Sequence, residues 1–330
     1  MNKVQLGRSD IHVTPVTFGA WAIGGWMWGS ADEKDAIDAL ETSIDLGMTT
    51  IDTAPVYGFG QSEALVGKVI QGRRDEVEIL TKYGLKWNEH RGQFYFETKH
   101  NDGHTVKLHK YASRESVIAE CEASLRRLNT DYIDLYQIHW ADPTTPVSET
   151  MEALERLIEQ GKVRAAGVCN YDVELAQKAN ENILLASDQV PYSMVRRDIE
   201  EDLVPWCIEQ NVAILAYSPL QRGLLTGKIT PDYEFGKGDN RPDTPYFQPG
   251  NIKKVNAFLE DIKPIADGRN ATLSQLVLAW TIAQPGITVA LAGARNRKQV
   301  EDNAGAMELN LSREEVEEIN EKLDRLDLDL

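Results

Sequence analysis

Short runs of apolar and β-branched residues alternate along this chain with amphipathic stretches whose apolar positions recur at helical spacing. In the stretch 32–46, for example, Ala36, Leu40 and Ile44 would share one face of a helix. Eight of the short runs are predicted to be strands: Val16–Ala20, Thr49–Thr53, Val77–Lys82, Ile133–His139, Arg164–Cys169, Ala186–Val190, Ala213–Tyr217 and Thr288–Leu291. The amphipathic stretches predict helices at Asp32–Leu46, Ser62–Ile70, Arg114–Leu128, Ser148–Gln160, Val173–Asn180, Glu200–Glu209, Ile252–Arg269, Leu273–Gln284 and Arg297–Ala304.

This alternation predicts the class of fold. Strands that alternate with helices become parallel neighbours joined by right-handed crossovers. Eight such units favour closure into a (β/α)8 TIM-type barrel over an open doubly wound sheet. A length of 330 residues suits one barrel with insertions, so we expect a single domain over residues 1–330.

Four segments lie outside the alternation. Residues 3–14 are predicted to form an N-terminal hairpin that plugs the N-terminal mouth of the barrel, and Ser312–Leu323 an extra C-terminal helix. Residues 84–112 and 229–250 follow the third and seventh strands and are expected to be long polar loops. Loops after barrel strands lie at the C-terminal mouth, where barrel enzymes build their active sites.

Charge and composition narrow the choice of partners and compartment. The formal net charge is −17, from 52 acidic and 35 basic residues, which disfavours nucleic acid and anionic membranes. The three cysteines, at positions 121, 169 and 207, have no paired spacing, and neither a secretory leader nor a long apolar run is evident. We therefore expect a cytoplasmic protein, either a monomer or a small homo-oligomer.

Four ionisable residues fall at or near the ends of successive predicted strands: Asp52, Tyr57, Lys82 and His139. Each alone would be an ordinary turn, packing or surface residue, but together they suit the reduction of a carbonyl. Tyr57 could donate a proton, since the ammonium of Lys82 would lower the phenol pKa. Asp52 would keep Lys82 charged, and His139 could hydrogen-bond the substrate oxygen.

Several longer motifs carry a specific resemblance. The chain is similar to the aldo-keto reductase superfamily from about residue 4 to residue 305, through IDTAPVYGFGQSE, LTKYG, LYQIHW, GKVRAAGVCNY and LAYSPLQRGLLTGK. The segments WAIGGWMWG and AGARNRKQVEDN resemble its bacterial branch of stress-related and glycerol-oxidising members, which has potassium-channel beta subunits among its relatives. The resemblance implies a metal-free (β/α)8 reductase in which Asp52, Tyr57, Lys82 and His139 form the catalytic set.

The resemblance also implies NADP(H), with NAD(H) as a second choice, lying across the barrel mouth. No G-x-G-x-x-G follows the first strand, so a Rossmann-type site is not supported. The implied cofactor residues are Trp21, Asp52, Cys169, Asn170, Gln189, Tyr217, Ser218, Leu220, Arg222, Gly293, Ala294, Arg295, Gln299, Asp302 and Asn303.

Two of these positions depart from the family pattern or bear on the choice of cofactor. Cys169 stands where a serine is usual, and a thiol is the weaker hydrogen-bond donor. Arg295 suits a 2′-phosphate, whereas Gln299 replaces an arginine of many relatives. Although the protein is acidic overall, Arg222 and Arg295 would provide fixed positive charge for the phosphates of the cofactor.

Aromatic residues near the mouth are candidates for the substrate pocket. We expect Trp21 and Trp140, with Tyr57 and His139, to contact the substrate, and Trp26 and Trp28 to pack in the core or a lid. The insertion could add Phe94, Tyr95 and Phe96. The insertion also holds His90, His100, His104 and His109, whose spacing matches no helix-face ligand pattern, so we expect no metal.

The sequence therefore predicts an oxidoreductase that interconverts small aldehydes or ketones and alcohols. Two alternatives remain open at this point. One is a cofactor-sensing regulatory subunit like the channel-associated relatives. The other is an unrelated phosphate-binding barrel enzyme, such as an isomerase, which would leave the four strand-end residues unexplained.

Overall fold

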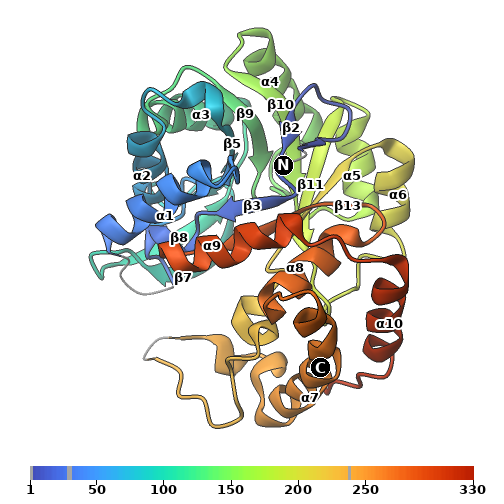
Figure 1. Cartoon of the computed structure of the whole chain (residues 1–330). Helices are drawn as coiled ribbons and strands as arrows, with labels where there is room; N and C mark the ends of the chain where they lie inside the picture. The colour runs from blue at the N-terminus through green and yellow to red at the C-terminus, as the bar shows by residue number, and fades with distance from the viewer. Residues whose placement is uncertain (1–2, 28–31, 237–238) are drawn as a thin grey trace.

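A computed structural model describes residues 3–27, 32–236 and 239–330 (Figure 1). Eight parallel strands close into a barrel in the order β3-β4-β5-β9-β10-β11-β12-β13, with β13 pairing back to β3. The barrel strands are β3 (Val16–Gly19), β4 (Thr50–Asp52), β5 (Glu78–Tyr83), β9 (Ile133–Ile138), β10 (Val163–Cys169), β11 (Leu185–Pro191), β12 (Ala213–Tyr217) and β13 (Ile287–Gly293). The predicted (β/α)8 barrel is confirmed, with strand boundaries within two residues of those expected.

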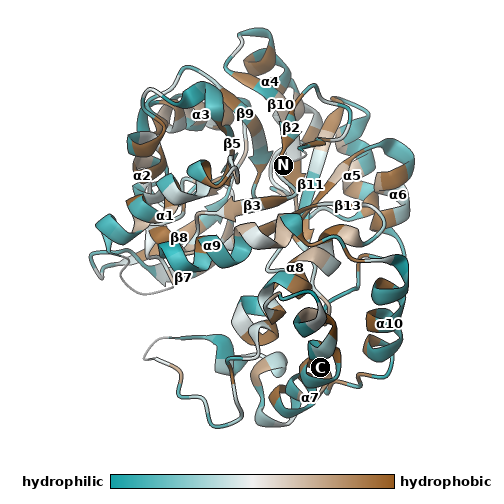
Figure 2. Ribbon diagram, viewed as in Figure 1, coloured by the Kyte–Doolittle hydropathy of each residue, from teal (hydrophilic) through white to brown (hydrophobic). Residues whose placement is uncertain are grey.

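Helices connect the strands and surround the barrel. They are α1 (Glu33–Asp45), α2 (Gln61–Val69), α3 (Arg114–Leu128), α4 (Val147–Glu159), α5 (Val173–Asn180), α6 (Leu203–Gln210), α7 (Pro249–Gly268), α8 (Leu273–Ala283), α9 (Arg297–Gly305) and α10 (Arg313–Leu323). Short 3-10 helices lie at Ala22–Gly24, Arg74–Glu76, Gln221–Thr226, Arg241–Asp243, Pro245–Phe247 and Ala306–Glu308. The amphipathic pattern is visible as brown faces toward the strands and teal faces outward (Figure 2).

Most helix boundaries lie within one residue of the prediction, but two helices begin three residues away from it. Helix α6 begins at Leu203 rather than Glu200, because Glu200 belongs to a preceding turn where it accepts hydrogen bonds from Tyr192 Oη and Arg197 Nε. Helix α7 begins at Pro249, three residues earlier than expected, since proline is well suited to the first turn of a helix.

The N-terminal mouth of the barrel is closed by a small hairpin, as predicted. Strands β1 (Val4–Gln5) and β2 (His12–Val13) pair antiparallel. The hairpin buries Leu6 and Ile11 against Leu80 and Leu135, which point inward from β5 and β9. The lower half of the barrel interior is therefore apolar and filled.

Residues 84–112 form an ordered structure, so the expectation of a solvated loop was wrong. Strands β6 (Leu85–Lys86), β7 (Gln93–Lys99) and β8 (Thr105–Lys110) make a three-stranded antiparallel sheet, which we call the hairpin arm. In β8 alternate residues are apolar and face the protein, so that Val106 and Leu108 are buried. This alternation with a period of two is the pattern of a half-buried strand, but it covers only a few residues of a long polar segment.

The remaining segments fit the expected plan. The described part of 229–250 consists of irregular turns and two short 3-10 helices, and its last two residues begin α7. Helix α10 lies outside the barrel and contacts α7, where Figure 1 shows it in dark red. None of the helices in residues 3–27, 32–236 and 239–330 combines the length and apolar character that crossing a bilayer requires.

Candidate active site

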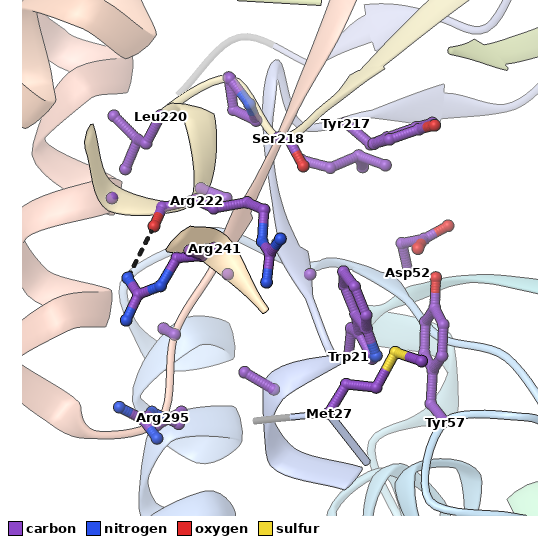
Figure 3. Close-up of a pocket in the computed structure, with 18 of the residues that line it drawn as sticks. Trp21, Met27, Asp52, Tyr57, Tyr217, Ser218, Leu220, Arg222, Arg241 and Arg295 are labelled. Atoms are coloured by element: carbon purple, nitrogen blue, oxygen red, sulfur yellow. Dashed lines mark hydrogen bonds between the residues drawn. The ribbon is translucent and has the colours of Figure 1, made fainter. Parts of the chain in front are cut away.

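A cavity of about 540 Å³ opens at the C-terminal mouth of the barrel. Its walls come from the ends of the barrel strands, from the hairpin arm and from the 229–250 segment. Figure 3 shows Asp52, Tyr57 and Trp21 at one end of this cavity, with Arg222 and Arg295 farther along it. One end is thus aromatic and acid–base active, and the other end is cationic.

The acid–base end is built on a buried ion pair. Lys82, at the end of β5, is fully buried, and its Nζ lies 2.6 Å from Asp52 Oδ1 at the end of β4. The same ammonium donates to the Thr53 carbonyl at 3.0 Å, and Gln189 Nε2 donates to Asp52 Oδ2 at 2.8 Å. These contacts satisfy both charges, which is the condition for burying an ion pair without a large penalty.

Tyr57 lies directly against this pair. Its ring centroid is 5.0 Å from Lys82 Nζ, and only 9% of the residue is exposed. Burial raises the pKa of Tyr57 to about 12, although the positive charge of Lys82 acts in the opposite direction. Lys82 does lower the phenol pKa, as expected, but the net shift is upward because desolvation outweighs the charge. The phenol is fully protonated near neutral pH.

The other side of Tyr57 is framed by two rings. Trp21 stacks at 6.0 Å between centroids, and His139 meets the Tyr57 ring edge-on at 5.7 Å. Burial, and then the charge of Lys82, holds the pKa of His139 well below its usual value. His139 is therefore a neutral imidazole near pH 7, which can donate one hydrogen bond without adding a charge.

Polar groups continue from this end along the floor of the cavity. Asn170 has a left-handed backbone conformation, with φ of 59°, that turns its side chain into the mouth. Its Nδ2 donates to the His139 carbonyl at 3.1 Å, while its Oδ1 accepts from Tyr217 Oη at 2.9 Å. Asn170 thus fixes the Tyr217 ring beside the cavity, and Gln189 presents its amide nearby.

The middle of the cavity carries two arginines. Arg222 lies in a turn after β12, and Arg241 comes from the 229–250 segment and donates to the Arg222 carbonyl at 3.0 Å (Figure 3). Burial and the nearby charge of Arg241 both lower the pKa of Arg222. The Arg241 guanidinium is also paired with Asp239, with Nη2 2.6 Å from Oδ2, and this carboxylate offsets part of the effect of Arg241 on Arg222. A bound anion would accept charge-assisted hydrogen bonds from the Arg222 side chain beside this pair.

The far end of the cavity is formed by the start of α9. Gln299 Oε1 accepts from the Arg295 backbone N–H at 2.8 Å, and Asp302 Oδ1 accepts from Thr272 Oγ1 at 2.7 Å. Asn303 Nδ2 donates to the Gly293 carbonyl at 3.3 Å. These side chains present hydrogen-bonding groups, and the first turn of α9 adds the positive end of a helix dipole.

Residues 15–324 match the model of the aldo/keto reductase family, which is nearly the whole chain. The chain belongs to the aldo/keto reductase family. It is accordingly an oxidoreductase enzyme, and its barrel is the fold of its solved relatives.

Two curated relatives show how this reductase compares in sequence. The chain is 38% identical to the aldo-keto reductase YhdN of Bacillus subtilis, over 97% of this chain and 93% of that protein. It is 37% identical to the NADH-specific methylglyoxal reductase of Escherichia coli, over 94% of this chain and 95% of that protein.

Solved structures show the same relationship. The glycerol dehydrogenase AKR11B4 of Gluconobacter oxydans superposes with a TM-score of 0.86 at 36% identity, covering 97% of this chain and 95% of that one. An aldo/keto reductase of Klebsiella pneumoniae, in complex with NADP and acetate, has a TM-score of 0.74 at 30% identity and covers 99% and 100%.

The cavity of this reductase gathers nearly all the residues named from the sequence. Those lining it are Trp21, Asp52, Tyr57, His139, Trp140, Asn170, Gln189, Tyr217, Ser218, Leu220, Arg222, Gly293, Ala294, Arg295, Gln299, Asp302 and Asn303. Lys82 does not line the cavity but reaches it through Asp52 and Tyr57. Cys169 is buried away from it, with Sγ 3.9 Å from Gln137 Oε1. Trp28 lies outside the described residues.

Some cavity residues were not identified from the sequence. Arg241 and Tyr233 come from the 229–250 segment, where an arginine and aromatics stand among proline, glycine and aspartate. Met27 and Leu85 also line the wall. Of the three aromatic residues suggested for the insertion, Tyr95 and Phe96 line the cavity, whereas Phe94 is 52% exposed. Arg241 could have been identified from the sequence, because an insertion after the seventh strand must lie at the C-terminal mouth.

Proposed function

We propose that this enzyme interconverts aldehydes or ketones and alcohols with NADP(H), and that Tyr57 transfers the proton. The observation that carries the proposal is the buried Asp52–Lys82 pair held against Tyr57, with His139 on the other side of the ring. In carbonyl reduction a hydride adds to carbon and a proton adds to oxygen. Tyr57 offers a protonated phenol that could hydrogen-bond the carbonyl oxygen of a substrate in the cavity.

Each residue of the set has a distinct part in the proton transfer. Tyr57 donates its phenolic proton to the carbonyl oxygen and becomes a phenolate, which the Lys82 ammonium stabilises. Asp52 keeps Lys82 charged and oriented, since an unpaired buried ammonium would be costly. His139, as a neutral imidazole, donates a hydrogen bond that positions the same oxygen. Alcohol oxidation reverses these transfers.

The cationic half of the cavity fits a dinucleotide. A bound reduced nicotinamide would supply the hydride, and a cavity of about 540 Å³ lies in the range of ligand sites of this size. Asn170 and Gln189 would hold the carboxamide, and the Tyr217 ring would stack on the nicotinamide. Arg222 and Arg241 would bind the pyrophosphate, with Asp239 holding the Arg241 side chain in place.

The adenosine end favours NADP(H) while leaving room for NAD(H). Arg295 would pair with a 2′-phosphate, and Gln299 and Asn303 would bind the ribose and adenine. Gln299 is neutral, so the phosphate would meet less positive charge than two arginines would offer. Among the relatives, one solved structure holds NADP and another protein is named NADH-specific.

The substrate end is aromatic, which favours carbonyl compounds with an apolar substituent. Trp21 and Trp140 form two sides of it. The hairpin arm adds Phe96, stacked on Trp26 at 6.4 Å, and Tyr95, 5.4 Å from the Trp140 ring. The arm is therefore the element that would select the substrate.

The proposal extends to the molecule as a whole. We place this enzyme in the cytoplasm, as a single barrel domain over residues 1–330 that is a monomer or a small homo-oligomer. Its partners are small molecules rather than nucleic acid, because a net charge of −17 repels a polyanion.

Replacing Tyr57 by phenylalanine tests the proposal directly. Turnover of an aldehyde such as benzaldehyde with NADPH should fall at least about a thousandfold, since the proton donor is lost while the ring remains. Fluorescence titration should still show NADPH binding. Tyr132→Phe is the matched control, because Tyr132 packs on Arg74 away from the cavity. Substantial turnover by the Tyr57 variant would remove this residue from the mechanism.

A further inference from the structure

The tip of the hairpin arm brings together three side chains with metal-binding atoms. His100 and His104 flank the β7–β8 turn, and their backbones pair through a hydrogen bond of 2.9 Å from His100 N to the His104 carbonyl. The turn between them contains Asp102 and closes at Gly103, which has φ of 93°. Because cross-strand partners project from the same face of a hairpin, the two imidazoles stand side by side. Their ring centroids are 4.7 Å apart.

The donor atoms of this cluster converge on one point. Asp102 Oδ1 lies 3.2 Å from His100 Nδ1 and 2.5 Å from His104 Nδ1, and all the ligand atoms lie within 4.8 Å of one another. In a tetrahedral site with bonds of ~2.0 Å, ligand atoms are about 3.3 Å apart. The separation of 3.2 Å between His100 Nδ1 and Asp102 Oδ1 already matches this value. A small rotation of the exposed His104 side chain would lengthen the shorter separation, between His104 Nδ1 and Asp102 Oδ1.

We propose that His100, Asp102 and His104 form a binding site for Zn²⁺ or a similar divalent transition ion. Two imidazoles and one carboxylate are a donor set that such ions prefer, and water would complete the coordination. The backbone N–H of His104 donates to Asp102 Oδ1 at 3.1 Å, which holds the carboxylate between the two imidazoles. The ion would displace the hydrogen bond between His104 Nδ1 and Asp102 Oδ1 and the long contact, at 3.4 Å, from Asp102 N to His100 Nδ1.

The metal site is connected to the loop that carries Tyr57. His100 stacks on Phe59, with 4.4 Å between ring centroids. Asn101 Nδ2, between the proposed ligands, donates to the Gly24 carbonyl at 3.0 Å and to Gln61 Oε1 at 2.9 Å. An ion at the tip would therefore fix the arm against the segments that follow β3 and β4.

This site would act on the arm rather than on the chemistry. The arm supplies Tyr95 and Phe96 to the cavity wall, so holding its tip would restrict how far the wall can open. The helix-face spacing considered in the sequence did not apply, because a turn rather than a helix brings the two histidines together.

Calorimetric titration of ZnCl₂ into the chelator-treated, tag-free enzyme tests the site. We expect one ion per chain, with affinity reduced at least about tenfold in His104→Ala and in Asp102→Asn. His12→Ala is the matched control, since His12 is an exposed histidine in the N-terminal hairpin and should leave Zn²⁺ affinity unchanged.

Hydrogen exchange of the arm supplies a second measurement. Zn²⁺ should slow amide exchange over residues 97–106 in the unmodified enzyme and in Tyr57→Phe, but not in His104→Ala. These measurements do not depend on turnover, so the metal site and the proposed reductase activity can fail separately. Equal Zn²⁺ binding by the unmodified enzyme and His104→Ala, or no binding by either, would overturn the site and leave a hydrogen-bonded turn.

Discussion

The two mouths of the barrel are built from the same strands but have opposite characters. At the N-terminal mouth, Leu80 of β5 and Leu135 of β9 point inward and pack under the hairpin residue Leu6. Two residues farther along the same strands, the inward positions are Lys82 and Gln137, both fully buried. A step of two residues keeps a side chain on the same face of a strand, so each strand changes from apolar filling to functional chemistry within one period.

The difference shows how a barrel separates stability from reactivity. Because all eight strands run parallel, their carboxyl ends meet at one mouth, and polar residues there share one cavity. The apolar layer below keeps water from the other side of the Asp52–Lys82 pair. Substitutions at the C-terminal mouth should therefore alter turnover, whereas substitutions at the N-terminal mouth should alter stability.

Lys82→Met should give the largest effect on the reaction. Without the ammonium, the Asp52 carboxylate remains buried beside Tyr57, and the pKa of the phenol rises further. We expect kcat to fall by about 10²- to 10⁴-fold, the range that acid–base groups contribute. Steady-state kinetics with NADPH and an aldehyde measure this, with circular dichroism as the check on folding. A kcat within about threefold of that of the unmodified enzyme would contradict the assignment of turnover to the C-terminal mouth.

Leu6→Ala should do the opposite at the plugged mouth. Leu6 is fully buried, and removing its side chain leaves a cavity that costs about 2–5 kcal/mol of the free energy of unfolding. Urea unfolding measures the loss, and kcat should not change. Leu184→Ala is the control, because Leu184 is 64% exposed and should change stability little. A fall in kcat without loss of stability would show that the two mouths are not independent.

Arg241→Gln tests the cationic part of the C-terminal mouth. It removes one of the two charges proposed for the pyrophosphate and the bond to the Arg222 carbonyl. The dissociation constant for NADPH should rise about tenfold, or about 1.4 kcal/mol, with kcat for bound enzyme unchanged. Fluorescence titration measures it against Arg313→Gln, an exposed arginine on α10. Unchanged affinity would place the phosphates elsewhere.

The smallest effect is expected from pH. Burial raises the pKa of Tyr57 to about 12, and burial with the Lys82 charge keeps the pKa of His139 well below its usual value. Both groups therefore keep one protonation state between about pH 6 and 9, and kcat/KM for reduction should vary less than about twofold there. The rate should fall only as pH approaches the Tyr57 pKa. A midpoint near pH 8 would mean that the working phenol is far more acidic.

The hairpin arm and the catalytic set differ in how far the sequence predicted them. Asp52, Tyr57, Lys82 and His139 were identified because strand ends can be read from the alternation, and parallel strands must bring those ends together. The arm was expected to be a solvated loop, because lysine, asparagine and aspartate surround the four histidines of this polar segment. Its pairing depends on contacts with Trp26 and Phe59, which no local pattern encodes.

The sequence by itself determined the barrel and its plug and placed the four proposed catalytic residues at neighbouring strand ends, because these follow from periodicity and strand direction. The proposed cofactor residues came instead from the resemblance of whole motifs to the family. Only the tertiary structure decided how those groups behave. Desolvation raises the pKa of Tyr57 although the charge of Lys82 lowers it. The Cys169 side chain is buried beside Gln137 rather than in the cavity wall. The approach of Arg241 to Arg222 and of His100 to His104 likewise depends on chain segments that meet only in the fold. Burial and proximity are properties of three-dimensional neighbours, so they lie beyond any pattern along the chain.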